Sequence, residues 1–424
     1  MKANELKEML RAGALSKWSM LYSDIEAETE RHIKAIDEFT KRFGDGRDIA
    51  VFSVPGRSEI SGNHTDHNNG KVLAGAIDRD IIAVAAKNSD GVIRFLSEGY
   101  PESRVELSKI NNPDNFENYT SEALIAGMAQ GFLNNSYEIG GYDAYATSEV
   151  LKGSGISSSA AYEVMIGNIL NHLYSGGKVE NSEIAKLARY SENVYFGKPC
   201  GLMDQMACAV GGFVYIDFEN ESAPVVEPIP FSLSEHGYSL CIVNTGGNHA
   251  DLNEDYASVP REMRAVAEAF GQKVLRGISE ADIIEKAPEL RKTLGDRAIL
   301  RAIHFVRENE RVEAIKAALS SDDIEGFLRG VSDSGSSSFK YLQNVYTNIN
   351  PTEQGLSLAL CVSEGFLSGK SCAARVHGGG FAGTVQAFVK SEYAEEYASL
   401  LDSVFGEGAT MRLSIRPLGA TRLF

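Results

Sequence analysis

The sequence predicts a folded protein of two domains that contain both helices and β-strands, and three observations lead to this expectation. The chain has 424 residues, which is enough for two large domains with substantial cores. Hydrophobic residues make up 43% and charged residues 23%, proportions that are typical of globular proteins and exclude disordered, collagenous or coiled-coil chains. Short β-branched runs alternate with helical stretches along the chain, and a stretch with three prolines at 220–236 interrupts them.

The first half is predicted to begin with helix and then to mix strands with helices. Residues 1–44 carry isoleucine and phenylalanine at helical spacing with charges between them, which indicates amphipathic helix. β-Branched runs separated by Asn, Gly and Asp then predict four strands, at 49–54, 72–77, 80–86 and 92–96. The remaining expected elements are helices at 121–133, 159–174 and 183–195, and strands at 142–150 and 212–218.

The second half is predicted to be mainly helical, from residue 260 to residue 366. Its expected other elements are strands at 238–243, 384–389 and 411–415 and a helix at 391–405. The serine-rich segment 332–338 predicts a flexible loop. We therefore expect a helical extension at 1–47, an N-terminal domain at 48–228 and a C-terminal domain at 229–424.

Charge and cysteine usage restrict the partners and the compartment. The 58 acidic and 41 basic residues give a net charge of -17, which repels nucleic acid and anionic lipid. No apolar leader opens the sequence and the longest apolar runs are strand-sized, so we expect neither export nor a membrane span. Five scattered cysteines without a C-x-x-C pair predict neither a disulfide framework nor a zinc site. A cytoplasmic protein fits these features best.

A glycine- and serine-rich segment, LKGSGISSSAA at 151–161, follows a predicted strand and opens a predicted helix. Gly153 and Gly155 allow close backbone approach, and the free N–H groups of the helix start would point at an anion. The hydroxyls of Ser157, Ser158 and Ser159 add donors or a magnesium ligand. The alternative is a serine-capped helix after a flexible turn, and the spacing is not that of a Walker A loop.

A polar segment, VPGRSEISGNHTDHNNG at 54–70, comes directly after a predicted strand. Its donors and acceptors suit a ligand rich in hydroxyls, although a polar surface hairpin would look the same. His64, Asp66 and His67 are close together in the sequence, but no fourth ligand comes from elsewhere in the chain, so they are weak support for a metal site. The polar side chains concerned are Arg57, Glu59, Asn63, His64, Asp66 and His67.

Two further segments complete the set of candidates. In SENVYFGKPCGLMDQ at 191–205, Asp204 has apolar neighbours, where a carboxylate is costly unless it is paired. Its functional interpretation is a general base or a partner of Arg57, and the alternative is a helix-capping residue. In HGGGFAG at 377–383, the glycines formally match the dinucleotide fingerprint G-x-G-x-x-G. A strand is predicted to follow, not a helix, so we expect a tightly packed loop there.

Together these segments resemble the signatures of the galactokinase branch of the GHMP small-molecule kinases. The family's PGRVNLIGEHTDYNGG is matched by PGRSEISGNHTDHNNG, and its GLSSSAS by GISSSAA. Its GxPCGxMDQ is matched by GKPCGLMDQ, and its TGGGFGG by HGGGFAG. A stretch from Arg301 to Val312 also resembles the family's RAxHVVxENxRV, and the likeness extends from about Val51 to the C-terminus.

The resemblance implies an α+β GHMP kinase fold of two domains, with ATP and sugar held in the cleft between them. The implied reaction is the ATP- and Mg²⁺-dependent phosphorylation of the anomeric hydroxyl of a sugar, with galactose as the first choice, by a monomer or weak dimer. Alternatives are a kinase for galacturonate, N-acetylgalactosamine or arabinose, or a sensor that binds sugar and ATP without turnover. The intact SSSA stretch and Asp204 favour an enzyme over a sensor.

The resemblance also implies roles for individual residues. Asp204 would be the catalytic carboxylate, and Arg57 would stabilise the transferring phosphoryl group and keep Asp204 ionised. Ser159 and Glu192 would hold magnesium. The implied ATP-binding residues are Gly153, Gly155, Ser157, Ser158 and Ser159, and the implied sugar-binding residues are Asn63, His64, Asp66, Gly201 and Tyr256.

The sequence departs from the family's signatures mainly at the expected sugar-binding residues. Asn63 replaces a glutamate, His67 replaces a tyrosine, and the run Ser58-Glu59-Ile60-Ser61 replaces Val-Asn-Leu-Ile. Asparagine keeps an acceptor oxygen but carries no charge, so we expect galactose binding about 10-fold weaker than with glutamate and relaxed discrimination at C6. The motifs therefore determine the type of reaction better than the identity of the sugar substrate.

Overall fold

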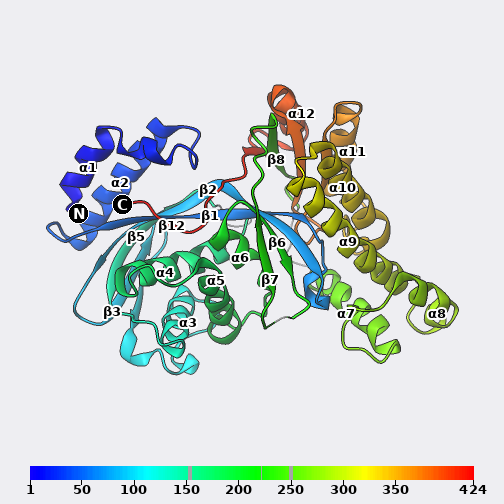
Figure 1. The fold of residues 1–424 in the computed structure, drawn as a ribbon, viewed down its shortest axis with the longest axis horizontal. Helices are drawn as coiled ribbons and strands as arrows, with labels where there is room; N and C mark the ends of the chain where they lie inside the picture. Colours follow the sequence, from blue (N-terminus) through cyan, green and yellow to red (C-terminus); the bar gives the residue numbers. More distant parts are fainter. Residues whose placement is uncertain (151–154, 221, 248–251) are drawn as a thin grey trace. The chain divides into compact units, whose positions relative to one another are not determined.

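The computed structural model describes residues 1–150, 155–220, 222–247 and 252–424, which form two compact units (Figure 1). Unit 1 comprises Met1–Arg57, Ala76–Gly212 and Arg416–Phe424, and unit 2 comprises Ser58–Gly75 and Phe213–Ile415. The chain passes between them inside two long strands, β1 (Ala50–Ser61) and β2 (Lys71–Lys87). The domain boundaries expected at 47/48 and 228/229 stay a prediction.

The sheet of unit 1 has the strand order β12-β1-β2-β5-β3-β4. Its remaining strands are β3 (Val92–Ser97), β4 (Ser103–Glu106), β5 (Tyr142–Ser148) and β12 (Thr421–Arg422). The strands predicted at 72–77 and 80–86 form one continuous strand, β2, which pairs with β6 through residues 71–75 and with β5 through residues 81–87. Below the sheet in Figure 1 lie α3 (Ser121–Asn134), α4 (Ser158–Tyr174), α5 (Asn181–Tyr190) and α6 (Met203–Val210).

The N-terminal residues of unit 1 form two helices, as the periodicity of residues 1–44 predicts. Helix α1 (Ala3–Arg11) ends before Gly13, whose φ of 88° allows the turn into a short 3-10 helix. Helix α2 (Ile25–Phe43) begins at Asp24, whose carboxylate accepts a hydrogen bond from the Ala27 N–H. Their apolar residues pack against Ile82, Val84 and other side chains of the sheet, so the extension shares the core of unit 1.

A buried carboxylate, Asp80, connects this extension to the sheet and to the C-terminal residues of unit 1. Its Oδ1 accepts a hydrogen bond from Arg31 Nη1 at 2.8 Å, and its Oδ2 accepts from Tyr22 OH at 3.0 Å and Arg416 Nη1 at 3.1 Å. Ser53 also donates to Oδ2. Burial alone would raise the pKa of Asp80, but Arg31 and Arg416 lower it to about 2.

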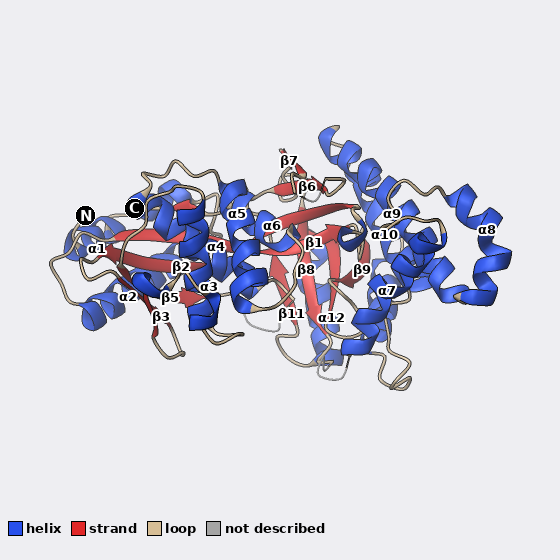
Figure 2. Cartoon of the chain, turned by 90° about the horizontal axis from the view of Figure 1, so that it is seen from below, coloured by secondary structure: helices blue, strands red, loops and turns tan. Residues whose placement is uncertain are grey.

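Unit 2 contains a four-stranded antiparallel sheet in the order β11-β8-β10-β9, shown in red in Figure 2. Its strands are β8 (Tyr238–Asn244), β9 (Ala373–His377), β10 (Thr384–Lys390) and β11 (Thr410–Leu413). In the same unit, β6 (Phe213–Asp217) pairs with residues 71–75 of β2 and with β7 (Val225–Ile229).

Unit 2 is rich in helices, and the predicted helical content of residues 260–366 is confirmed. They are α7 (Asn253–Ala269), α8 (Glu280–Thr293), α9 (Asp296–Ser320), α10 (Ile324–Ser337), α11 (Gly355–Leu367) and α12 (Ala394–Phe405). Helices α10 and α11 contact β9, and α12 contacts β8. As predicted, the glycine cluster 377–383 is followed by a strand, β10.

The flexible loop predicted at 332–338 is wrong, because these residues end α10 and begin a short π-helix, Ser338–Leu342. Ser334, Ser337 and Ser338 are buried hydrogen-bonding partners, whereas Ser332 and Ser336 are exposed on the helix. Ser334 donates to Glu308 and accepts from Arg375, and Ser337 bonds the ring of His304. A segment of serines thus serves as a polar helix face.

Among the described helices, none is both long and apolar enough to cross a membrane.

Replacing Asp80 with alanine is expected to destabilise unit 1 by about 3–5 kcal/mol, because Arg31 and Arg416 would lose the buried charge that they face. Urea unfolding measures this loss. Since the folded-state pKa of Asp80 is lowered from 3.8 to about 2, its stabilisation is present above pH about 4 and is lost as the pH falls between these values. The control, Lys34→Ala, removes an exposed ion pair with Glu98 and should leave the urea midpoint unchanged.

Candidate active site

In unit 1, an arginine and an aspartate from distant parts of the sequence form a two-bond ion pair. Arg57, on β1, donates from Nε to Asp204 Oδ1 at 2.8 Å and from Nη2 to Asp204 Oδ2 at 2.9 Å. Its Nη1 donates to the Gly155 carbonyl at 2.7 Å. A Cβ at Gly56 would lie 2.7 Å from the Ile156 carbonyl, so glycine is required for this close approach. The strand, the glycine–serine segment and the start of α6 thus meet at one guanidinium.

Asp204 is the carboxylate on which these elements converge. Burial raises its pKa, but the Arg57 guanidinium outweighs this effect and holds the pKa below its usual value. Ser157 donates a further hydrogen bond to Oδ2 from a backbone with φ of 62°, a region that non-glycine residues rarely adopt. The Asp204 side chain retains 34% exposure, so an ionised carboxylate is available to a ligand.

The segment predicted to bind phosphate opens α4, and it borders a cavity of about 300 Å³ in unit 1. Ser158 and Ser159, in the first turn of α4, line this cavity. Free N–H groups and the positive end of the helix dipole make such a helix start a favourable place for phosphate. Gly153, which was also predicted to bind phosphate, lies outside the described residues.

Aromatic side chains form a large part of the wall of this cavity, and sequence reasoning did not identify them. A slot with aromatic walls and a few hydroxyls suits a flat heteroaromatic ring. Because the rings come from five separate segments, no local spacing in the sequence could reveal them. The aromatic lining residues are Phe95, Tyr100, Tyr119, Tyr162 and Phe196.

Glu192, a predicted magnesium ligand, is buried in a π-helix that follows α5. Its carboxylate accepts hydrogen bonds from Lys198 Nζ at 3.1 Å and Gln205 Nε2 at 2.8 Å. Gln205 Nε2 also donates to Glu163, where burial and the nearby charge of Glu192 raise the pKa well above its usual value. The joint role of Glu192 and Ser159 as magnesium ligands stays a prediction.

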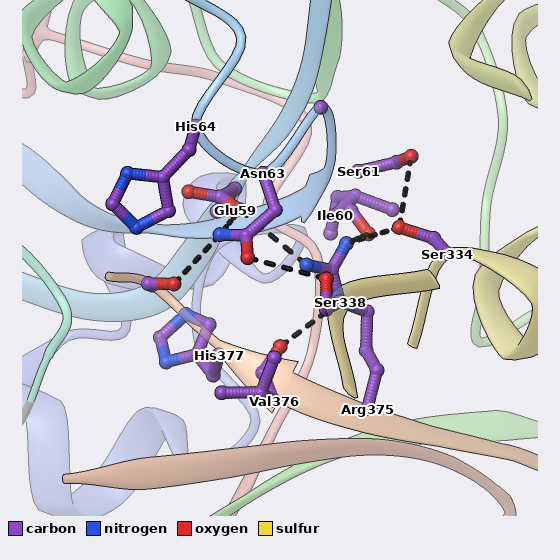
Figure 3. Close-up of polar contacts among 12 residues, drawn as sticks. Glu59, Ile60, Ser61, Asn63, His64, Ser334, Ser338, Arg375, Val376 and His377 are labelled. Atoms are coloured by element: carbon purple, nitrogen blue, oxygen red, sulfur yellow. Dashed lines mark hydrogen bonds and ion pairs between the residues drawn. The ribbon is translucent and has the colours of Figure 1, made fainter. Parts of the chain in front are cut away.

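In unit 2, the predicted sugar-binding residues Asn63, His64 and Tyr256 converge on one loop, and Figure 3 shows the first two. Asn63 Nδ2 donates to the Gly378 carbonyl at 2.7 Å, and His64 Nε2 lies 2.9 Å from the Gly379 carbonyl. Tyr256 OH donates to the Gly380 carbonyl at 2.8 Å. The glycine cluster of the sequence is therefore a loop whose carbonyls are held by side chains.

The other two predicted sugar-binding residues belong to different units. Asp66 is half-buried in a 3-10 turn of unit 2, and Gly201 is an exposed residue of unit 1 before α6. His67, which departs from the family's tyrosine, is half-buried beside His64, with the ring centroids 5.9 Å apart. Burial lowers the pKa of His67 to about 3, so its ring is neutral.

Comparison with known families gives two matches. A family model described as the galactokinase galactose-binding signature matches residues 37–87. A second, described as the GHMP kinases N-terminal domain, matches residues 123–212. The two matches include the segments that hold Arg57, Asn63, the start of α4 and Asp204.

Relatives of known function match over most of the chain. A galactokinase of Streptomyces coelicolor is 31% identical over 361 residues, covering 84% of this chain and 88% of the relative. A galactokinase of Glaesserella parasuis is 32% identical, covering 86% and 91%. Among solved structures, Lactococcus lactis galactokinase complexed with galactose matches with a TM-score of 0.76 at 22% identity, covering 91% and 98%. A mevalonate kinase matches with a TM-score of 0.58 at 15% identity, covering 87% and 99%. The predicted GHMP kinase fold is thereby confirmed.

Replacing Arg57 with glutamine is expected to raise the pKa of Asp204 above its usual value, because burial then acts without the opposing guanidinium. Carbon NMR of aspartate carboxyls follows this pKa without any need for activity. Arg57→Lys keeps the positive charge but loses the planar guanidinium that bonds both carboxylate oxygens, so the pKa of Asp204 should lie between those of the wild type and Arg57→Gln. The matched control is Arg79→Gln, which removes a half-exposed partner of Glu149. An Asp204 pKa that stays low in Arg57→Gln would contradict this assignment.

Proposed function

This chain belongs to the galactokinase family, and from that premise we propose that it transfers the terminal phosphoryl group of ATP to the anomeric hydroxyl of galactose. The observation that carries the proposal is the ionised Asp204, held by Arg57 beside the start of α4. These groups supply a proton acceptor, a positive charge and a phosphate-binding helix start in one place. Phosphoryl transfer depends on this kind of positioning and charge stabilisation more than on covalent chemistry.

In the proposed step, the anomeric oxygen forms a bond to the terminal phosphorus while the bond from that phosphorus to the bridging oxygen of ADP breaks. The hydroxyl proton passes to a carboxylate oxygen of Asp204. Because Arg57 lowers the pKa of Asp204, this carboxylate is a weak base that accepts the proton late, as suits a loose transition state. Arg57 faces the negative charge that develops on the transferring oxygens.

ATP is proposed to lie in unit 1, with its phosphates at the first turn of α4 and its adenine in the aromatic cavity. Gly153, Gly155, Ser157, Ser158 and Ser159 are the residues proposed at the phosphates. The volume of about 300 Å³ and the mixture of rings and hydroxyls suit a purine with a few fixed polar contacts.

Mg²⁺ is proposed to be held by Ser159 and Glu192. A hydroxyl and a carboxylate are oxygen ligands, which this ion prefers. Glu192 is paired with the exposed Lys198, whose charge the ion would replace. When bound, the ion would neutralise negative charge on the phosphates. Lys198 would then be free to face the phosphates itself.

The other readings have less support. A sensor without turnover would not require the ion pair of Asp204 with Arg57. A kinase for another sugar is less supported because the two relatives described above are both galactokinases. All five cysteines are free thiols, which suits the cytoplasm that we propose as the location. The monomeric or weakly dimeric state stays a prediction.

Asp204→Asn is expected to lower kcat for galactose about 100-fold or more, because the amide keeps the shape but cannot accept the proton. ADP release in the presence of a panel of sugars measures the rate. Binding of galactose and ATP should persist, and an unchanged melting temperature would show that the fold is intact. Turnover close to that of the wild type would contradict the assignment of Asp204.

Ser97→Trp is expected to raise the KM for ATP at least about 10-fold, because an indole would fill the cavity in which we place adenine. The KM for galactose should stay within about twofold in the same assays. Ser222→Trp, on an exposed turn, is the control for the added indole. An ATP KM that does not change in Ser97→Trp would place adenine elsewhere.

A further inference from the structure

Two departures from the family's signature are reciprocal. Where the signature reads Asn and then Glu four residues later, this chain has Glu59 and then Asn63. The two side chains touch, with Asn63 Nδ2 donating to Glu59 Oε1 at 2.8 Å (Figure 3). A carboxylate and an amide are therefore both kept at this place, with their positions in the sequence exchanged.

Asn63 has no hydrogen-bonding capacity left for a ligand. Its Nδ2 makes two bonds, to Glu59 and to the Gly378 carbonyl. Its Oδ1 accepts two bonds, from Asn344 Nδ2 at 2.7 Å and from Ser338 Oγ at 3.2 Å. An asparagine side chain offers two donors and two acceptor positions, and here all four are used within the protein. The residue is also fully buried.

These bonds position the glycine loop. Asn344, which donates to Asn63, also donates to the Gly379 carbonyl at 3.1 Å. The backbone carbonyl of Asn63 is bonded in turn by the neutral ring of His304, whose pKa burial lowers to about 4. Asn63 is thus the centre of a buried polar network that links β1, α9 and the loop.

Glu59 differs because its carboxylate is only partly used. Its Oε1 accepts from Asn63 and lies 3.6 Å from Arg375 Nη2, beyond hydrogen-bond distance. No hydrogen bond reaches its Oε2 from the described residues, and 8% of the side chain is exposed. Arg375 is fully buried, and its Nη2 has no hydrogen-bond partner there either. The Oε2 atom of Glu59 is therefore an acceptor without a hydrogen bond from the described residues, beside the buried guanidinium of Arg375.

We propose that Glu59 is the carboxylate that accepts a hydrogen bond from a hydroxyl of the bound sugar, and that Asn63 positions Glu59 and the glycine loop without touching the sugar. The assignment rests on the proposed sugar kinase function. It replaces the expectation that Asn63 itself contacts the sugar. The carboxylate that the family's signature has at position 63 is supplied here by Glu59, which contacts Asn63.

The proposal narrows the substrate class to neutral sugars. A uronic acid would bring its own carboxylate toward Glu59, and the two like charges would repel each other. A sugar hydroxyl instead donates to the free oxygen of Glu59 and keeps the charge of Arg375 balanced. The relaxed discrimination at C6 that the uncharged Asn63 alone would predict is therefore not expected.

The first test replaces Glu59 with glutamine and measures binding and turnover of galactose and galacturonate. We expect a sugar KM about 10-fold higher, because a hydrogen bond to a charged group becomes one to a neutral group. The KM for ATP should stay within about twofold, and the preference for galactose over galacturonate should shrink. Glu313→Gln, which removes another hydrogen-bonded carboxylate of unit 2, is the matched control and should leave the sugar KM unchanged.

The second test exchanges the pair. Asn63→Glu alone places a carboxylate against Glu59 and the Gly378 carbonyl, and it should lower the melting temperature by about 5 °C or more and weaken galactose binding. The double variant Glu59→Asn/Asn63→Glu should recover at least half of both losses. Additive effects of the two substitutions would overturn the pairing.

The outcomes separate this proposal from the proposed function. If the wild type binds and phosphorylates galactose but Glu59→Gln leaves the sugar KM unchanged, the role of Glu59 is overturned while the function stands. Equal binding of galacturonate and galactose by the wild type would overturn it as well. If the wild type binds no sugar, both the function and the sugar contact fail, and the melting temperatures still report whether Glu59 and Asn63 form a pair.

Discussion

The candidate active site depends on one guanidinium. Arg57 uses three of its nitrogens to hold both oxygens of Asp204 and the carbonyl of Gly155. Since these partners belong to α6 and to the segment before α4, the arginine fixes the proposed catalytic carboxylate relative to the helix start that we propose binds phosphate. A lysine offers a single charged point and could not make these directed bonds together. The local backbone conforms to this arrangement, with glycine at position 56 and a left-handed backbone at Ser157.

Much of the fold and part of the site could be predicted from sequence because the signals are local. The helix starting at Ser158 and the strand at 384–390 follow from periodicity and from the glycine and serine residues before them. The aromatic cavity could not be predicted, because its walls come from segments that only the folded sheet brings together. The error at 332–338 has a different cause, since the composition of a segment does not show that its hydroxyls will meet buried charges such as Glu308 and Arg375.

The asparagine at position 63 leads to one conclusion from the sequence alone and to another from the structure. Taken alone, the loss of a carboxylate at this position predicts a weaker and less selective sugar site. The contacts show that the asparagine is committed to Glu59, Ser338, Asn344 and the Gly378 carbonyl, and that a carboxylate remains beside it. Position-by-position comparison cannot find such an exchange, because it lies in a contact between two positions.

The discontinuity of unit 1 affects how the chain folds as it leaves the ribosome. The Asp80 carboxylate takes one arginine from the N-terminal extension and another, Arg416, from the last nine residues, and β12 in those residues pairs with β1. During synthesis from the N-terminus, the sheet of unit 1 therefore keeps an open edge and an incompletely neutralised buried charge until residues 416–424 have been made. Over the synthesis of the intervening residues of unit 2, the nascent chain therefore exposes an edge that is prone to aggregation.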